Sequence, residues 1–276
     1  MSAFEEHRQF LVGVAYRMLG SFAEADDVVQ DAYLRWSAAD RGDVEHPRAY
    51  LARVVSRLCL DRMKSAAARR EEYPGTWLPE PLVADVSATS GEDLSMALLM
   101  TLERLSPLER AAFLLHDVFE MDYSAIAQTI ERSESAVRQL AARAREHVRD
   151  ERPRFTASPE SQEKLANAFA FALASNDVDG IARLLADEAV FYTDGGGKRH
   201  AALNPIHGRD KIVRFLLGVT RKALPLERVD RVQINGLPGF VVWTSEGPET
   251  LSLHVQNERI VALYGIRNPD KLRHLS

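Results

Sequence analysis

The stretch SPLERAAFLLHDVFEMDYSAIAQTIERSESAVRQLAARAREHVR, residues Ser106 to Arg149, decides the fold of the middle of this chain. Its apolar residues recur at steps of three and four, which predicts short amphipathic helices. Before the turn ERSE, the inner face consists of Ile126, Ala127 and Ile130; after it, of Val137, Leu140, Ala144 and Val148. Two such helices joined by a four-residue turn are typical of a helix-turn-helix that lays its second helix in the DNA major groove.

The outer face of the second helix holds the candidate DNA-contacting residues: Ser135, Arg138, Gln139, Arg143 and Arg145. Arginine and glutamine suit two-pronged contacts with base edges, and further arginines suit phosphates. The alternative is that these arginines are simply solvated on an exposed helix. The two-helix pattern favours DNA binding.

The bulk composition is that of an intracellular globular protein. The 276 residues predict two or three domains, and the net charge is −5, so positive charge must be concentrated locally to bind DNA. Cys59 is the single cysteine, which excludes an internal disulfide and fits a reducing compartment. The N-terminus lacks the pattern of a signal peptide and no stretch predicts a membrane span, so we expect the cytoplasm. The eight histidines are scattered, so we expect neither a metal site nor a cofactor.

Three helices are predicted before residue 71. The first covers residues 3–19 and ends at Gly20, and the capping box Ser21–Glu24 opens a second one with an acidic face. Pro47 begins the third helix, whose polar face carries five cations: Arg48, Arg53, Arg57, Arg62 and Lys64. A cationic face of this kind suits the backbone of a nucleic acid strand.

Residues 71–91 are rich in proline, glycine and serine and are predicted to be a linker. Trp77 and Leu78 are unusual there, because a free linker gains nothing from apolar side chains, so we expect this part to dock. We therefore predict domains at residues 1–70, 92–153 and 158–276. In the last domain helices come first, including one over DVDGIARLLAD, and strands follow, which predicts an α+β fold.

Several stretches resemble a known family. AEADDVVQDAYLRW with HPRAYLARVVSRLCLDRMKS resembles region 2 of bacterial sigma factors, and the opening stretch resembles region 4. Their order and short linker are similar to the extracytoplasmic-function (ECF) group. WLPEP, DGGGK and NPDKL resemble signature patches of the subgroup with a SnoaL-like extension. The resemblance implies two all-α sigma domains followed by an α+β SnoaL-like cone, the fold of nuclear transport factor 2.

The resemblance also implies partners. The helix after Ser21 would dock on the β′ clamp of core RNA polymerase through Asp26, Asp27, Gln30, Asp31 and Trp36. Region 4 would meet the β flap. The five cations of region 2 would contact the minus-ten promoter element, with a base captured near Asp40, Arg41 and Asp43, and region 4 would contact the minus-35 element. The alternative for the acidic helix is a solvated face.

For the last domain, three hypotheses stay open. In the preferred one it grips the linker at Trp77, Leu78 and Pro79, with contact surfaces that include Asp194, Lys198, Asn268 and Asp270. Alternatively, it binds a small ligand or catalyses a cyclisation or isomerisation, with Asp194, His200, His207 and His254 as candidate acids or bases. Asp194 before three glycines reads most simply as a turn residue. A repressor that never touches polymerase would explain the helix-turn-helix but not residues 21–70.

Overall fold

The computed structural model describes residues 3–38, 44, 46–84, 95–151, 158–222 and 225–275. Asp40, Arg41 and Asp43, expected near a captured base, lie outside the described residues. The chain divides into two compact units: unit 1 comprises Met1–Glu72 and Leu98–Arg152, and unit 2 comprises Tyr73–Ala97 and Pro153–Ser276. The segment that follows residue 72, predicted as a linker, is therefore part of unit 2 together with the C-terminal domain.

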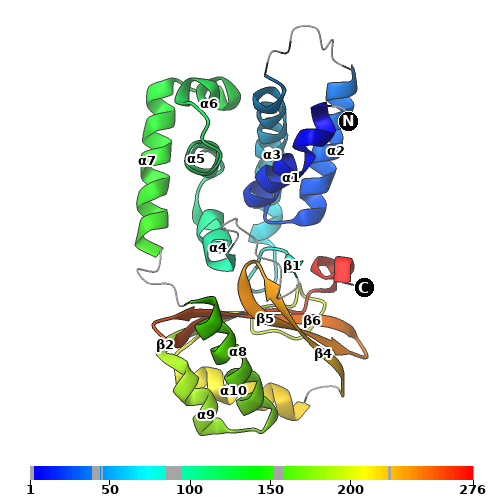
Figure 1. The fold of residues 1–276 in the computed structure, drawn as a ribbon, viewed down its shortest axis with the longest axis vertical. Helices are drawn as coiled ribbons and strands as arrows, with labels where there is room; N and C mark the ends of the chain where they lie inside the picture. Colours follow the sequence, from blue (N-terminus) through cyan, green and yellow to red (C-terminus); the bar gives the residue numbers. More distant parts are fainter. Residues whose placement is uncertain are drawn as a thin grey trace. The chain divides into compact units, whose positions relative to one another are not determined.

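Unit 1 is helical, as predicted, and Figure 1 draws its helices in blue to green. The helices are α1 (Ala3–Leu19), α2 (Phe22–Ala38), α3 (Pro47–Glu71), α4 (Met96–Arg104), α5 (Pro107–Phe113), the π-helical η1 (Leu114–Val118), α6 (Tyr123–Ile130) and α7 (Glu134–Glu151). Gly20 ends α1 with φ +70°, and the Ser21 hydroxyl accepts from Glu24 N at 3.2 Å at the start of α2.

The helix-turn-helix forms where the sequence predicts it. Glu131 ends α6 in the left-handed region at φ 56°, and the Ser133 hydroxyl accepts from Ala136 N at 3.3 Å to cap α7. Ile126, Ile130, Val137, Ala144 and Val148 are buried, as expected. Ala141 is also fully buried whereas Leu140 is only half-buried, so the inner face of α7 is rotated slightly from the predicted one.

Unit 2 is an α+β domain with a seven-stranded sheet in the order β1-β4-β5-β6-β7-β2-β3. The strands are β1 (Val83–Ala84), β2 (Leu185–Asp194), β3 (Ile206–His207), β4 (Leu226–Ile234), β5 (Leu237–Thr244), β6 (Gly247–Gln256) and β7 (Arg259–Ile266). The helices are α8 (Pro159–Ala174), α9 (Val178–Leu184), α10 (Arg209–Lys222) and the short η2 (Pro269–Lys271) and η3 (Arg273–Leu275).

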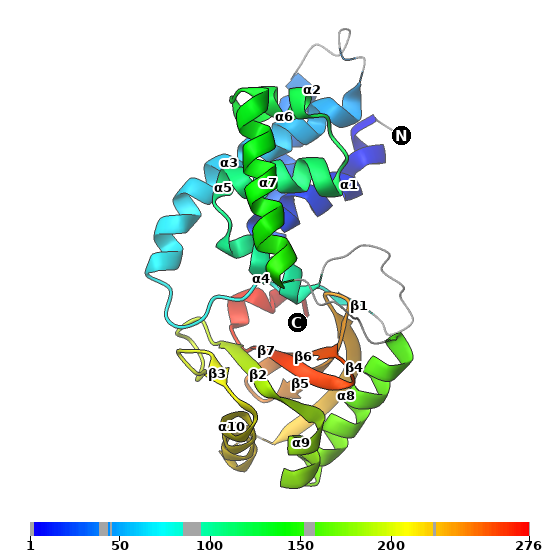
Figure 2. The same cartoon turned by 90° about the vertical axis from the view of Figure 1, so that its left-hand side faces the viewer.

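Helices α8, α9 and α10 lie on one side of the sheet, and the C-terminal η2 and η3 lie on the other (Figures 1 and 2). The core lies between these three helices and the sheet and includes Phe169, Ile181, Ile212, Phe191 and Leu263. This arrangement is the one expected of a SnoaL-like domain.

One predicted helix is too long. DVDGIARLLAD was expected to be helical throughout, but α9 ends at Leu184 and β2 begins at Leu185. The reason is tertiary: Leu185 pairs with Ile260 of the parallel strand β7, and a register shift follows before the ladder resumes at Val190. Local periodicity does not report such long-range pairing.

Phe169 and Phe171 test the core of unit 2 as a matched pair on one helix. Phe169 is 0% exposed and Phe171 is 75% exposed. We expect Phe169→Ala to lower the free energy of unfolding of unit 2 by about 3–5 kcal/mol, and Phe171→Ala to change it by less than about 0.5 kcal/mol. Urea unfolding monitored by hydrogen exchange separates the units. Equal effects of the two substitutions would show that the core is misplaced.

Candidate nucleic-acid interface and linker-binding site

Helix α7 presents an exposed polar face near its N-terminus. Ser135, Arg138, Gln139 and Arg143 are all exposed, and together they form the face that the sequence predicts for contact with DNA. The Ser135 hydroxyl lies 3.0 Å from the Ser133 hydroxyl. Side chains in the first turns of such a helix are those that reach base edges.

Tyr123, the first residue of α6, connects two arginines of α7. The Arg138 guanidinium lies 4.4 Å from the centre of the Tyr123 ring and pairs with Glu134 at 2.5 Å. The Tyr123 hydroxyl accepts from Arg145 at 2.9 Å. Tyr123 and Glu134 therefore restrict the position of Arg138, and the sequence analysis missed both because neither is basic.

Arg145 occupies a different position from the predicted one. It donates to the Asp117 carboxylate at 2.6 Å, and the acceptors Asp117 and Tyr123 raise the pKa of its guanidinium. Arg145 is half-buried and joins α7 to η1. A phosphate would therefore have to compete with Asp117 for this guanidinium, and the contact of Arg145 with DNA stays a prediction.

The predicted cationic face of α3 is largely engaged inside unit 1. Arg48 lies over the Phe10 ring at 4.2 Å, and Lys64 pairs with Asp61 at 3.0 Å. Arg57 donates to backbone carbonyls of α6. The buried Nε of Arg53 has no hydrogen-bond partner among the described residues.

The acidic face of α2 forms ion pairs within unit 1. Arg62 of α3 pairs with Asp27 at 3.4 Å and with Asp31 at 3.2 Å. Asp26 pairs with Arg8 at 2.5 Å, and Gln30 is exposed. These exposed ion pairs contribute little stability, so a partner can replace them at small cost.

Trp36 was predicted to contact polymerase from the surface of α2, but the structure places it in the core. It is 4% exposed and its ring lies 5.7 Å from that of Tyr50, so it packs in the core of unit 1. Trp36 is large and apolar and lies at helical spacing from the other buried residues of α2, which explains its position in the core. The exposed apolar side chains of α2 are Phe22, Tyr33 and Leu34, which the sequence analysis did not select.

In unit 2, the linker is bound by the buried carboxylate of Asp194 at the end of β2. Oδ1 accepts from the Tyr73 hydroxyl at 2.6 Å and from Gly196 N at 3.0 Å. Oδ2 accepts from Leu78 N at 2.9 Å and from the Lys271 ammonium at 2.7 Å. A buried carboxylate needs such donors. Asp194 makes the contact with Gly196 that is expected of a turn residue. The prediction of a turn role was incomplete, because two of its four hydrogen-bond donors belong to the linker.

Lys271 joins the linker to the C-terminal tail. Its ammonium also donates to Leu78 O and lies 4.1 Å from the centre of the Trp77 ring and 5.1 Å from that of Tyr73. Leu78 is 0% exposed. The apolar linker residues that were unusual in the sequence thus have a binding site in unit 2, and Pro79 beside them is buried too.

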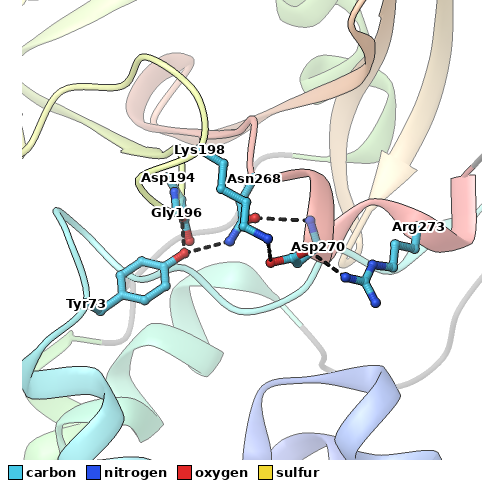
Figure 3. Close-up of polar contacts among 7 residues, drawn as sticks. All are labelled: Tyr73, Asp194, Gly196, Lys198, Asn268, Asp270 and Arg273. Atoms are coloured by element: carbon cyan, nitrogen blue, oxygen red, sulfur yellow. Dashed lines mark hydrogen bonds and ion pairs between the residues drawn. The ribbon is translucent and has the colours of Figure 1, made fainter.

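A second set of polar contacts surrounds the first, as Figure 3 shows. Asn268 donates to the Tyr73 hydroxyl at 2.8 Å and accepts from Asp270 N at 3.0 Å. Asp270 pairs with Lys198 at 2.5 Å and with Arg273 at 2.6 Å, and these cations lower the pKa of its carboxyl. The structure therefore brings DGGGK and NPDKL together around the linker. Burial and the hydrogen bond to Asp194 raise the pKa of Tyr73, which keeps its hydroxyl protonated as a donor.

The three glycines after Asp194 are required by close contacts. A Cβ at Gly196, which has φ +60°, would lie 2.2 Å from Asn268 Nδ2. A Cβ at Gly197, with φ +70°, would lie 2.7 Å from Pro74 of the linker. A glycine run that is a weak signal in the sequence is thus part of the linker-binding site.

The linker also extends the sheet. Val83 and Ala84 pair antiparallel with Ile234 and Gln233 of β4. Asn235 makes two bonds with Leu82: its backbone N–H donates to Leu82 O at 2.9 Å, and its side-chain Oδ1 accepts from Leu82 N at 3.1 Å. Adding a strand to an exposed sheet edge is a recurring mode of peptide recognition. Sequence analysis missed both β1 and Asn235.

The histidine candidates for catalysis do not converge. His200 and His207 are exposed. His254 is buried on β6 beside Gln256 Nε2 at 3.2 Å, and burial lowers its pKa. Among the described residues, no group of three or more histidine, cysteine or acidic side chains is arranged to hold a metal ion. The described helices include none with the length and apolar character of a membrane span.

Comparisons with known proteins agree with this architecture. Family models match residues 3–69, as Sigma-70 region 2, and residues 95–148, as Sigma-70 region 4. The ECF RNA polymerase sigma factor SigJ of Mycobacterium tuberculosis is 38% identical, over 98% of this chain and 92% of that protein. The probable ECF sigma factor SigI of the same species is 37% identical, over 67% of this chain and 66% of that protein. The crystal structure of SigJ matches with a TM-score of 0.80 and 35% identity, covering 98% of this chain and 97% of that one.

Replacing Asp194 tests the linker-binding site. Asp194→Asn leaves the Lys271 ammonium, 11% exposed, without its carboxylate, which costs about 3–5 kcal/mol. We expect chymotrypsin to cleave the full chain within residues 73–82 at least about tenfold faster.

Asp187→Asn is the matched control on the same strand, because Asp187 is 82% exposed and pairs only with the partly exposed Arg209 among the contacts described. Its cleavage rate should equal that of the native chain. If Asp194→Asn also left the rate unchanged, the carboxylate would not hold the linker.

Replacing Tyr123 tests how Arg138 is positioned. Tyr123→Ala removes the ring beneath Arg138, whereas Tyr123→Phe keeps the ring and removes only the bond from Arg145. We expect the alanine variant to lose part of the ~1–3 kcal/mol that an arginine contributes to discrimination at one base pair, and the phenylalanine variant to retain it. Selection from a randomised duplex library measures the preference. Identical base preferences for the two variants would contradict this role.

Proposed function

This chain belongs to the ECF sigma factors of the sigma-70 family. We propose that its C-terminal domain, by holding the linker, limits the distance that can separate the two promoter-binding regions. As a sigma factor it binds core RNA polymerase and directs promoter recognition and transcription initiation. The proposal concerns how unit 2 modulates that activity in cis. The observation that supports this proposal most directly is that Tyr73 and Leu78 of the linker both donate hydrogen bonds to the Asp194 carboxylate.

The docked segment shortens the tether. Helix α3 ends at Glu71 and α4 begins at Met96. At 3.3–3.6 Å per residue, the chain between them reaches roughly 85 Å when undocked. Docking of Tyr73–Ala84 on unit 2 leaves residues 85–95 as the longer connection, with a reach of roughly 40 Å. Region 2 is then joined to unit 2 by Glu72 alone, and region 4 by the longer piece.

A shorter tether changes promoter binding through effective concentration. Two weak modules bind cooperatively when the tether between them matches the spacing of their sites. The docked linker restricts the spacings that fit, so unit 2 should make the protein selective for the distance between the minus-ten and minus-35 elements. Its contribution is geometric and requires no contact between unit 2 and DNA.

The contacts of each region follow from the exposed surfaces. We propose that α2 meets the β′ clamp through Asp26, Asp27, Gln30 and Asp31 together with the exposed Tyr33 and Leu34. Region 4 would meet the β flap, and its Ser135, Arg138, Gln139 and Arg143 would contact the minus-35 element. The cations of α3 would contact the minus-ten element. We place the protein in the cytoplasm, where the polymerase acts.

The alternative of a catalytic unit 2 has less support. Asp194 already accepts four hydrogen bonds, so it lacks the unoccupied lone pair that a general base needs. The hydrogen-bond contact of His254 is with Gln256, an amide that is neither an acid nor a base. We propose that the linker itself is the ligand of this domain.

Promoters of varied spacer length test the proposal. The native holoenzyme should show a narrow optimum, whereas Asp194→Asn and Leu78→Ser should broaden it. They should also lower the maximum by about threefold, because effective concentration falls as roughly the −3/2 power of tether length. Leu226→Ser, at a 60% exposed position of β4, is the matched control. Run-off transcription from a series differing by single base pairs gives the profile.

Unchanged profiles in both undocked variants would contradict the proposal. The chymotrypsin assay establishes independently whether the linker has been released in each variant.

A further inference from the structure

One outer edge of the sheet in unit 2 is only partly covered. Strand β4 lies between β5 and β1, and β1 pairs with it at Gln233 and Ile234. Among the described residues, no strand lies beside the rest of this edge. Val229, which is 49% exposed, lies in the middle of the uncovered part. An edge of this kind offers its unpaired backbone groups to another strand.

The backbone groups of Val229 point toward this open edge. The β4–β5 hairpin closes with the pair Ile234 and Leu237 around a two-residue turn, which makes these two residues a hydrogen-bonded pair. Because backbone groups alternate in direction along a strand, those of Val229 and Arg231 face away from β5. The regular ladder with β5 begins at Arg228, after a register shift. The edge therefore has room for a short antiparallel strand centred on Val229.

The residues along this edge read ERVDR, from Glu227 to Arg231, and their charges are complementary to a second copy of the same stretch. If a second copy pairs antiparallel with Val229 opposite Val229, Arg228 lies opposite Asp230 of the second copy, and Glu227 lies opposite Arg231. Each neighbouring register, shifted by one or two residues, places like charges opposite each other. Charged residues on an edge normally prevent pairing between copies, but in the Val229 register they attract.

The two charges nearest the centre are already held in position. Asp230 accepts from Trp243 Nε1 at 2.7 Å, and Arg228 lies 4.6 Å from the centre of the Trp243 ring. Arg228 and Asp230 also pair with each other at 2.8 Å, and both remain partly exposed. They share a face of the strand, because they are two residues apart. Arg231 pairs with Glu163 of α8 at 3.0 Å, so the contact of Arg228 with Asp230 is the main electrostatic one.

We infer that the uncovered edge of β4 is a self-association surface, at which two copies of this chain join their sheets antiparallel across a twofold axis at Val229. A contact made by the same surface of both copies closes on itself, so association stops at a dimer. The regular edge is short and the interface is correspondingly small, so the dimer is weak and its formation depends on concentration. This inference does not rest on the proposed role of the linker, whose strand β1 covers other residues of the edge.

Analytical ultracentrifugation of the full chain measures the association. We expect the native chain to change from monomer to dimer over the micromolar range of concentration. Val229→Lys places two lysines opposite each other at the axis, so the dissociation constant should rise at least about tenfold. Val178→Lys, at the first position of α9 and 47% exposed, is the matched control and should leave the constant unchanged. Circular dichroism checks that each variant keeps its fold.

A pair of charge reversals tests the register. Arg228→Asp places aspartates opposite each other between two copies, and Asp230→Arg places arginines opposite each other, so each variant alone should stay monomeric where the native chain dimerises. In an equal mixture the two variants meet with opposite charges at both contacts, and a heterodimer should form. A change confined to the fold of one chain does not predict this recovery on mixing.

Three results would overturn the inference. The first is a native chain that stays monomeric throughout the micromolar range. The second is a dimer that Val229→Lys leaves intact, because the contact would then lie elsewhere on the chain. The third is a mixture of the two charge reversals that stays monomeric.

Discussion

The organisation of unit 2 depends on one buried carboxylate. Asp194 is 1% exposed, and its two oxygens accept from a tyrosine hydroxyl, two backbone amides and an ammonium group. Two of these donors come from the linker and two from the C-terminal domain. A buried charge is tolerated only when its hydrogen-bonding capacity is met, so the domain and the linker stabilise each other. This requirement explains Tyr73 of the linker and Lys271 of the tail, which both donate to Asp194.

The internal partners of the cations in unit 1 explain how a chain with a net negative charge can carry basic helices. Most of the cations predicted to face DNA have an internal partner: Arg62 has the acids of α2, Arg145 has Asp117, and Arg57 has the carbonyls of α6. Partly exposed ion pairs such as those of Arg62 are weak, so a stronger partner can displace them at small cost. Together with a net charge of −5, this arrangement leads us to expect weak binding of the free protein to arbitrary DNA.

The parts of the fold that local pattern determines were predictable. The helix-turn-helix, the ends of α1 and the cap at Ser21 follow from periodicity and capping residues within a few positions of each other. What was missed or misplaced depends on partners far along the chain. Trp36 was expected on a surface and is in the core, Arg145 was expected at a phosphate and joins two helices, and β1 pairs with a strand about 150 residues away. Apolar residues in a linker were the one local signal of such a distant contact.

The central claim is that the linker remains docked on unit 2 while the protein initiates transcription. The most direct measurement is hydrogen exchange of residues 73–84 in the complex of full chain, core polymerase and promoter DNA, compared with the free chain. We predict that the Leu78 amide, bonded to Asp194, exchanges slowly in both states. Rapid exchange of that amide in the promoter complex would contradict the account, because the linker would then have left its site when the distance between the two regions matters.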